Sequence, residues 1–292
     1  MKREDCARPG PAALPTIGLA LGGGGARGLA HIGVLKALER AGIPVHVLAG
    51  TSMGGLIAAL YAAGRPAAEI EAETLRLGKL NQLLNLVDLG LPRRAFLSGD
   101  KLYAFLQEKL GPQLTFAQLR RPLALTAVDL ISGKEIILRE GSVAEAVRAT
   151  ISLPGMLEPV ERSGQLLVDG GVLNNVPADQ ARALGAEIVI AVNVSLDVHD
   201  DRQWQHVGLP AILVDSWRAD AISAAALTEI RLALVRPEVL LCPPISSEIT
   251  TLTGFTRAAE IIAAGEAAVE EALPRLLRLA RPGRPVDAGA QP

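Results

Sequence analysis

The first feature that could carry chemistry is a serine flanked by glycines. Residues 50–54 read Gly-Thr-Ser-Met-Gly, a G-x-S-x-G pattern between an apolar run and a helical one. In such a turn a nucleophilic serine needs neighbours without side chains, because only then can the strand and the helix approach each other. The hydroxyl of Ser52 would project at the N-terminus of the helix, which favours developing negative charge. The pattern indicates a nucleophile, and an idle serine in a helix cap is the simpler alternative.

A glycine-rich loop precedes this serine in the sequence. Residues 22–28 read GGGGARG, directly after an apolar run and before a helical one. The loop matches the G-x-G-x-x-G fingerprint of dinucleotide-binding proteins, but that fingerprint also requires an acidic residue at the end of the next strand. Residues 41–63 contain no Asp or Glu, so nucleotide binding is the weaker alternative. Consecutive backbone N–H groups before a helix are suited to bind a phosphate or an oxyanion, and a tight turn is the simpler alternative.

A nucleophilic serine also requires a proton acceptor, and the sequence offers two kinds. Asp169 follows the apolar run Leu166–Val168 and precedes two glycines. A carboxylate at the end of a buried strand is held rigidly, and its desolvation raises its pKa and makes it a better base. An Asp that merely begins a turn is the alternative. His199 or His206, in a polar stretch, could instead complete a Ser–Asp–His triad, whereas we expect the other two histidines to pack or cap.

An alternation of strands and helices must position these residues. Short apolar runs predict strands, at Ile17–Leu21, Val45–Ala49, Leu123–Leu130, Glu135–Leu138, Leu166–Val168 and Glu187–Val194. Apolar residues at helical spacing predict helices, at Leu29–Ala41, Leu56–Ala63, Ala67–Leu110 with interrupting loops, Ala211–Leu234 and Thr256–Leu279. We therefore expect one α/β domain over residues 16–280, with parallel strands and helices on both faces of the sheet. A mobile tail at 1–15 and a disordered tail at 281–292 would flank it.

Composition excludes several classes of protein. The chain has 292 residues, of which 49% are hydrophobic, and its 29 basic and 31 acidic residues give a net charge of −2. No basic excess favours nucleic acid, so we expect no nucleic-acid partner. Cys6 and Cys242 lie far apart and form neither a zinc-site spacing nor a disulfide framework, which fits a reducing compartment.

Two segments bear on location. The first 16 residues lack the apolar region of a signal peptide. Residues 41–64 carry no formal charge over a length that could span a membrane, but five glycines divide them, which predicts strand, turn and helix instead. We therefore expect a cytoplasmic protein. The leucine-rich stretch 75–91 could cap a site and touch a membrane surface transiently at its inner face, although ordinary helix packing explains the same leucines.

Together the three motifs resemble the patatin-like phospholipase family, in particular its short bacterial members. That family has a G-G-G-x-R/K-G loop, a G-x-S-x-G elbow and an Asp-Gly-Gly/Ala turn, in this order. Here they are Gly23–Gly28, Gly50–Gly54 and Asp169–Gly171. The resemblance covers Ile17–Ser195 and fades over the last third of the chain.

The resemblance implies a three-layer α/β/α sandwich with a mostly parallel central sheet, and a Ser–Asp dyad without histidine. It makes Ser52 the nucleophile and Asp169 the base, with no metal and no cofactor. It places the oxyanion hole at three glycines, Gly23, Gly24 and Gly25. Arg27 fills the family's basic position, where it steadies the loop or meets a lipid phosphate. The supporting glycines of the three motifs are Gly28, Gly50, Gly54, Gly170 and Gly171.

The expected function is hydrolysis of an acyl ester in a phospholipid, a lysophospholipid or a related lipid ester, through an acyl-enzyme intermediate. A binding or regulatory protein that keeps the scaffold with little turnover is the main alternative, because motifs identify parts and not a rate. A nucleotide-binding enzyme is the weaker one. Acyl length, head group and oligomeric state do not follow from the sequence.

Overall fold

The structure of the protein is a computed structural model that describes residues 14–77, 95, 97–200, 211–250 and 254–281. Its strands are β1 (Ile17–Leu21), β2 (Val47–Gly50), β3 (Leu123–Asp129), β4 (Lys134–Leu138), β5 (Val160–Arg162), β6 (Gln165–Asp169), β7 (Ile188–Val192) and β8 (Val239–Leu241). Its α-helices are α1 (Ala30–Arg40), α2 (Met53–Ala62), α3 (Ala67–Leu77), α5 (Asp100–Leu110), α6 (Val143–Thr150), α7 (Ala178–Ala183), α8 (Ala211–Val235) and α9 (Ala258–Leu279). Short 3₁₀ turns are η1 (Gly25–Leu29), η2 (Phe116–Gln118), η3 (Gly170–Val172) and η5 (Gly254–Arg257).

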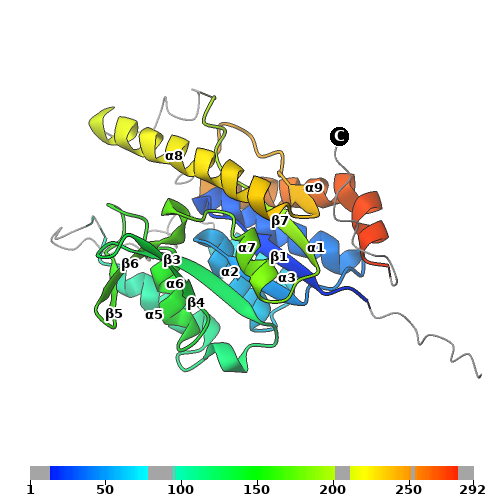
Figure 1. Ribbon diagram of the computed structural model, residues 1–292, viewed down its shortest axis with the longest axis horizontal. Coiled ribbons are helices and arrows are strands. Elements are labelled where there is room, and N and C mark those ends of the chain that lie inside the picture. Colours follow the sequence, from blue (N-terminus) through cyan, green and yellow to red (C-terminus); the bar gives the residue numbers. More distant parts are fainter. Residues whose placement is uncertain (1–13, 78–94, 96, 201–210, 251–253, 282–292) are drawn as a thin grey trace, which may run out of the picture.

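Within the described residues, eight strands form one mixed sheet in the order β5-β6-β3-β2-β1-β7-β8, and β4 pairs with β3 beside this path (Figure 1). The pairs from β3 through β2, β1 and β7 to β8 are parallel. The pairs that involve β4, β5 and β6 are antiparallel. The expected mostly parallel sheet is confirmed, with an antiparallel extension at the end that carries Asp169.

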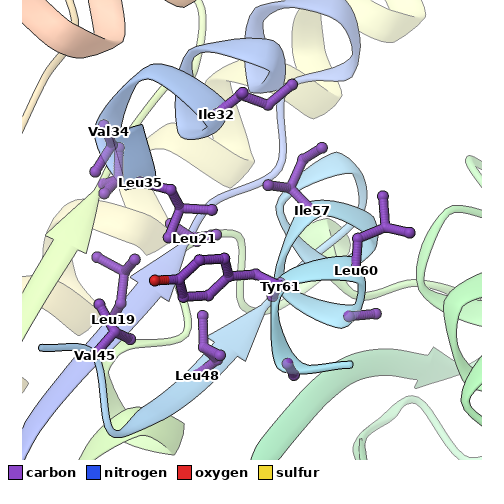
Figure 2. Packing of buried hydrophobic residues seen from close by; sticks show 14 of the residues in the cluster. Leu19, Leu21, Ile32, Val34, Leu35, Val45, Leu48, Ile57, Leu60 and Tyr61 are labelled. Atoms are coloured by element: carbon purple, nitrogen blue, oxygen red, sulfur yellow. The ribbon is translucent and has the colours of Figure 1, made fainter. Parts of the chain in front are cut away.

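The sheet is the middle of three layers, because its side chains alternate between two apolar clusters. Leu19 and Leu21 of β1 point to the face that α1, α2 and α9 cover, and Figure 2 shows them packed among residues of α1 and α2. Ala20 and Ala191 point to the opposite face, under α7 and α8. Alanines on this second face let α7 lie close to the sheet. The predicted α/β/α sandwich is thus confirmed.

Two strands meet end to end beside β3. Leu125 of β3 pairs with Gly50 of β2 and, on its other edge, with β4. Ala127 of β3 pairs with Asp169 of β6 and again, on its other edge, with β4. Because β4 occupies the same edge at both positions, β2 and β6 share the opposite edge. Since β2 runs parallel and β6 antiparallel to β3, their C-terminal ends face each other, and this brings two distant motifs together.

The predicted strands and helices are present, with boundaries that shift by a few residues. The sequence did not predict β5, β8, α6 and α7, because each is short. A signal for α6 did exist, since Ser142 caps it by accepting a hydrogen bond from the N–H of Glu145, a serine-to-glutamate spacing typical of helix starts. The predictions for residues 1–13, most of the stretch 75–91, His206 and residues 282–292 lie outside the described residues.

None of the helices in the described ranges has the length and apolar character that crossing a membrane requires. The uncharged segment 41–64 forms β2 and α2, as its glycines predict.

Candidate active site

Ser52 connects the end of β2 to the start of α2, as the G-x-S-x-G pattern predicts. Its backbone has φ 54° and ψ −127°, a conformation that costs a non-glycine residue about 1–3 kcal/mol and is typical of functional sites. The N–H of Ser52 donates to Oγ1 of Thr150 at 3.0 Å, which helps to hold this conformation. Gly54 is required in the same turn, because a Cβ there would collide with the carbonyl oxygen of Leu21 at the end of β1.

Asp169 is the last residue of β6, and only 4% of it is exposed. Its carboxylate accepts a hydrogen bond from the N–H of Gly171 at 2.8 Å, and the side chain of Ser52 lies close enough to it to lower its pKa. Burial raises the pKa of Asp169 to about 6, although its interactions with the Ser52 side chain and the Gly171 N–H lower it in part. The structure thus joins the two predicted catalytic side chains, and it gives the carboxylate the raised pKa that a base at the end of a buried strand is expected to have.

The segment at the end of α6 holds Ser52 and Asp169 against each other. Thr150 accepts the N–H of Ser52, and the carbonyl oxygen of Ser152 accepts the N–H of Asp169 at 2.9 Å. Arg148 is buried and donates to Oγ of Ser152 at 2.6 Å, which fixes the segment in turn. Sequence reasoning missed these contacts, because their residue types carry no signal beyond their place in a stretch that resembles the family.

The glycine loop faces Ser52. A Cβ on Gly23 would lie 3.1 Å from the Cβ of Ser52 and 2.5 Å from Oδ1 of Asn175, so the loop can approach the serine only with glycine there. The N–H of Gly23 donates to the carbonyl oxygen of Asn175 at 3.0 Å. Among the residues that the structure describes, the N–H groups of Gly24 and Gly25 have no acceptor. These two groups are therefore available to an anion, whereas the N–H of Gly23 is already engaged.

Asn175 connects the glycine loop to the end of the sheet and was missed by sequence reasoning. Its Nδ2 donates to the carbonyl oxygen of Gly23 at 3.3 Å and to Oγ of Ser195 at 2.9 Å. Its backbone carbonyl accepts the N–H of Gly23. Asn175 therefore binds both the N–H and the carbonyl oxygen of Gly23. The only available signal was the position of Asn175 shortly after the Asp-Gly-Gly turn.

Arg27 is buried beneath the glycine loop, with 6% exposed. Its guanidinium donates to the carbonyl oxygens of Val194 at 2.9 Å and Ile249 at 3.0 Å, and over longer distances to those of Ser195 and Ser246. Desolvation lowers its pKa to about 10, so it remains charged at neutral pH. Of its two expected roles, these contacts favour steadying the loop, and they attach the loop to the last third of the chain.

The described histidines do not compete with Asp169 for the role of base. His31 is buried, its Nε2 lies 2.7 Å from the carbonyl oxygen of Gly22, and burial lowers its pKa to about 4. It therefore packs under the loop as a neutral donor, as expected. Nδ1 of His46 accepts the N–H of Ile17 at 2.9 Å. His199 is exposed, and the titratable group whose pKa the side chain of Ser52 affects is the carboxylate of Asp169.

Thr51, next to the serine, is anchored beneath the site. Its Oγ1 lies 2.7 Å from Oγ1 of Thr126 and donates to the carbonyl oxygen of Asn174 at 2.8 Å. Thr126 lies in β3 between the two residues that pair with β2 and β6. Gly170 packs directly on Thr126, where a Cβ would collide with it. The turns that carry Ser52 and Asp169 therefore rest on the same threonine.

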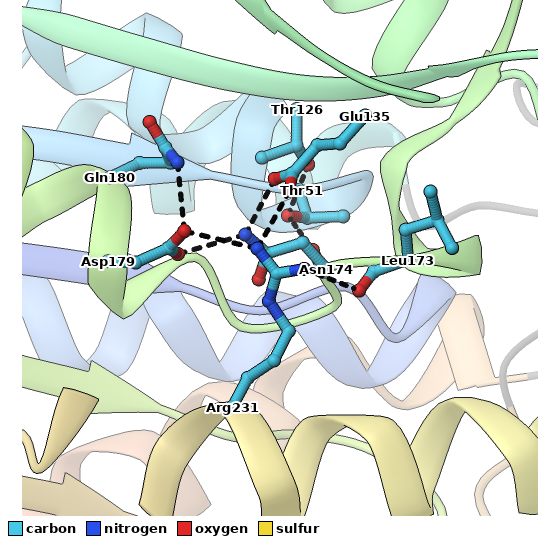
Figure 3. A network of polar contacts seen from close by, with 8 residues as sticks. All are labelled: Thr51, Thr126, Glu135, Leu173, Asn174, Asp179, Gln180 and Arg231. Carbon is cyan, nitrogen blue, oxygen red and sulfur yellow. Dashed lines mark hydrogen bonds and ion pairs between the residues drawn. The ribbon is translucent and has the colours of Figure 1, made fainter. Parts of the chain in front are cut away.

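A second polar network reaches this anchor from α8 (Figure 3). Arg231 of α8 donates to Glu135 at 2.7 Å, to Asp179 at 3.1 Å and to the carbonyl oxygen of Leu173 at 3.2 Å. Nδ2 of Asn174 donates to the same two carboxylates, at 2.7 Å and 2.9 Å. The turn that follows Asp169 is thus fixed by charges on three surrounding elements, β4, α7 and α8.

The remaining predicted glycines occupy positions of close approach around the site. In each case a Cβ would meet a neighbour at 3.2 Å or less, with Gly28 against Met53, Gly50 against Gly55 and Gly171 against Asn175 and Asp169. No three His, Cys, Asp or Glu side chains of the described residues form a group that could hold a metal ion.

Comparison with known proteins gives matches over the same part of the chain. A family model described as Patatin-like phospholipase matches residues 19–182, more than half of the chain, and this range contains both Ser52 and Asp169. An uncharacterized NTE family protein of Mycobacterium tuberculosis (strain ATCC 25618 / H37Rv) is 36% identical over 194 residues, 64% of this chain and 53% of that protein. Human patatin-like phospholipase domain-containing protein 6 is 40% identical over 187 residues, 61% of this chain and 13% of that protein.

The chain therefore spans about half the length of the mycobacterial relative and a small part of the human one. Among solved structures, VipD from Legionella pneumophila is similar with a TM-score of 0.59 at 14% sequence identity, over 90% of this chain and 68% of that one. At this identity the likeness concerns the fold.

Proposed function

This chain belongs to the patatin-like phospholipase family, and from this premise we propose that it is a serine hydrolase of lipid acyl esters with Ser52 as nucleophile and Asp169 as base. The observation that carries the proposal is that the ends of β2 and β6 meet along β3 and place the side chain of Ser52 beside a buried carboxylate whose pKa is raised to about 6. The name of the human relative, which contains the word phospholipase, supports a lipid substrate.

In the proposed first step, Asp169 accepts the proton of the Ser52 hydroxyl while Oγ attacks the ester carbonyl carbon. Burial raises the pKa of the carboxylate, which makes it a stronger proton acceptor. The strained backbone of Ser52 keeps Oγ directed at the site without a conformational search. The product of this step is a tetrahedral intermediate with a negatively charged oxygen.

We assign the stabilisation of this oxyanion to the N–H groups of Gly24 and Gly25. Neither has an acceptor among the described residues, whereas the N–H of Gly23 is bound to Asn175. Gly23 then serves a different purpose, because its missing side chain lets the loop approach Ser52. One preorganised donor of this kind typically lowers a barrier by about 3 kcal/mol.

Collapse of the intermediate would transfer the proton from Asp169 to the leaving alcohol and leave an acyl group on Ser52. Water, activated by the same carboxylate, would then hydrolyse this acyl-enzyme and restore both side chains. The acyl chain would lie along apolar side chains beside the dyad. Leu153 follows Ser152 and Val172 follows Gly171, and both are more than 40% exposed, so they can receive an apolar chain.

The test is hydrolysis of a phospholipid, a lysophospholipid and a simple p-nitrophenyl ester by the full chain. Ser52→Ala and Asp169→Asn should each lower kcat/KM by roughly a thousandfold or more. Ser223→Ala, which removes an exposed serine hydroxyl from α8, is the matched control and should retain activity. Unchanged activity in either dyad variant would contradict the mechanism, and a wild-type chain without turnover on any ester would favour the binding or regulatory alternative.

A further inference from the structure

Helix α8 is long for the surface on which it packs. It spans Ala211–Val235 and contacts α7 and the η3 turn. Figure 1 shows its N-terminal half projecting toward the upper left, away from α7. The inward side of its C-terminal half carries buried Thr228 and the charge-bonded Arg231. Helices in proteins owe most of their stability to packing, and the opposite side of α8 faces away from these partners.

That opposite side is apolar and exposed. Its members are exposed and lie within about 40° of Ala226 around the helix axis at 100° per residue, and they are Ala219, Ile222, Ala226, Ile230 and Ala233. Ile222 is 47% exposed and Ile230 is 59% exposed. A helix that is apolar on its outward side as well as its inward side is normally buried on both. We call this outward side the α8 face, and we expect a binding partner to cover it.

The residue types along the α8 face are symmetric about Ala226. Four residues before and after Ala226 lie Ile222 and Ile230. Three residues further out on each side lie Ala219 and Ala233. An isologous interface requires such self-complementarity, because each residue i meets a residue j of the partner and the reverse. In an antiparallel pair with its twofold axis at Ala226, Ile222 of each copy would lie against Ile230 of the other. Alanines at the centre permit a close interhelical distance of about 8 Å.

The ends of the helix are complementary in charge as well. Asp215 is exposed near the N-terminus, and Arg236 is exposed directly after the C-terminus. An antiparallel pair brings the Asp215 end of one copy to the Arg236 end of the other, at both ends of the interface. A membrane is a poorer occupant, because exposed Asp215 and Glu229 lie on or beside the α8 face and anionic lipid attracts basic rims and not acidic ones.

We propose that the protein forms a homodimer in which two α8 helices pair antiparallel about an axis through Ala226. The proposal does not depend on the hydrolytic function. It does bear on the site, because the inward side of the same helix carries Arg231, which binds the turn that follows Asp169. Pairing would therefore brace the polar network beneath the catalytic turn.

The first test is the mass of the full chain in solution, by light scattering over a concentration series. The wild type should have twice the 30.5 kDa of one chain. Ala226→Glu should be monomeric at concentrations where the wild type is dimeric, because two like charges would meet at the axis, and glutamate is well tolerated in an exposed helix. Leu277→Glu, which changes an exposed leucine on α9, is the control and should remain dimeric. A monomeric wild type, or a dimeric Ala226→Glu, would overturn the proposal.

The second test fixes the register by cross-linking. In a chain with Cys6→Ser and Cys242→Ser, Ala226→Cys should form an intermolecular disulfide under copper–phenanthroline oxidation, because the two residues face each other at the axis. Asp220→Cys, on another side of the helix, should not. Equal cross-linking of both would contradict the register. Co-sedimentation with phosphatidylglycerol vesicles that Ile230→Glu abolishes, without any change in mass, would assign the α8 face to a membrane and overturn the dimer.

Discussion

The N–H of Ser52 donates a hydrogen bond to Oγ1 of Thr150 at 3.0 Å, although 98 residues separate them in the sequence. Two residues further on, the carbonyl oxygen of Ser152 accepts the N–H of Asp169. The end of α6 thus sets the position of the serine relative to the carboxylate. It does so at the place where β2 and β6 meet end to end along β3.

Thr150→Val tests whether this hydrogen bond holds the strained serine. Valine keeps the shape of the side chain but leaves the partly buried N–H of Ser52 without an acceptor, which costs about 1–3 kcal/mol. We expect a fall in kcat of about tenfold or more with a small change in KM, measured on the ester that the wild type hydrolyses best. Thr150→Ser keeps the acceptor and should restore kcat. Equal losses in both variants would indicate a packing role instead.

Asp169→Asn should lose activity and gain thermal stability. Burial holds the pKa of Asp169 at about 6, whereas the unfolded chain has the ordinary value near 3.9. Between these values the native state binds a proton that the unfolded state lacks, so a rise in pH through this range lowers stability, by on the order of 3 kcal/mol in all. Asparagine cannot ionise, so the variant avoids the loss of stability that ionisation of the buried carboxylate causes. Thermal unfolding should show a higher Tm for the variant at about pH 8 and a smaller gain at about pH 4, and a lower Tm at both would contradict the buried carboxylate.

The pH dependence of kcat/KM should report the same carboxylate. The base must be ionised to accept the serine proton, so kcat/KM should rise as pH increases through about 6. An unperturbed histidine titrates in the same range, so the profile needs two control variants. His31→Gln and His199→Ala should leave the midpoint unchanged, since His31 is neutral above about pH 4 and His199 is exposed. A midpoint that disappears in either variant would assign the base to histidine.

We expect Arg27 to affect the stability of the protein and not its preference among substrates. Its guanidinium donates to four backbone carbonyls under the glycine loop, and lysine cannot reproduce that geometry. Arg27→Lys should therefore lower the free energy of unfolding by about 2 kcal/mol, measured by urea denaturation. The ratio of activities on a phospholipid and on a neutral ester should stay as in the wild type. A selective loss of phospholipid hydrolysis at unchanged stability would return Arg27 to the role of binding a lipid phosphate.

The residues with local signals were predictable from the sequence. Residues next to Ser52 and Asp169 in the sequence indicate the tight turn at each position. Ser52 has flanking glycines between a strand and a helix, and Asp169 ends an apolar run. The order of strand, loop, helix, strand, turn and helix likewise predicted the parallel core of the sheet. Local patterns suffice for these features because the physics that shapes them is local.

The residues that support the dyad were not predictable, because their contacts are distant in the sequence. Thr150 reaches back 98 residues, Asn175 reaches back 152 to the glycine loop, and Arg27 reaches forward 222 to Ile249. The contact of Arg27 lies in the last third of the chain, where the family resemblance fades. Only the folded sheet, which brings β2 and β6 to the same edge of β3, makes these partners neighbours.

The most direct test of the account is the site of reaction with a fluorophosphonate, located by mass spectrometry in the wild type, Ser52→Ala and Asp169→Asn. An activated serine attacks this probe, and an idle one does not. We predict an adduct on Ser52 in the wild type, none at that position in Ser52→Ala, and a much slower reaction in Asp169→Asn. Folded wild-type protein that stays unlabelled in the presence and absence of lipid micelles, or labelling of Ser52 that is as fast in Asp169→Asn as in the wild type, would contradict the Ser52–Asp169 dyad.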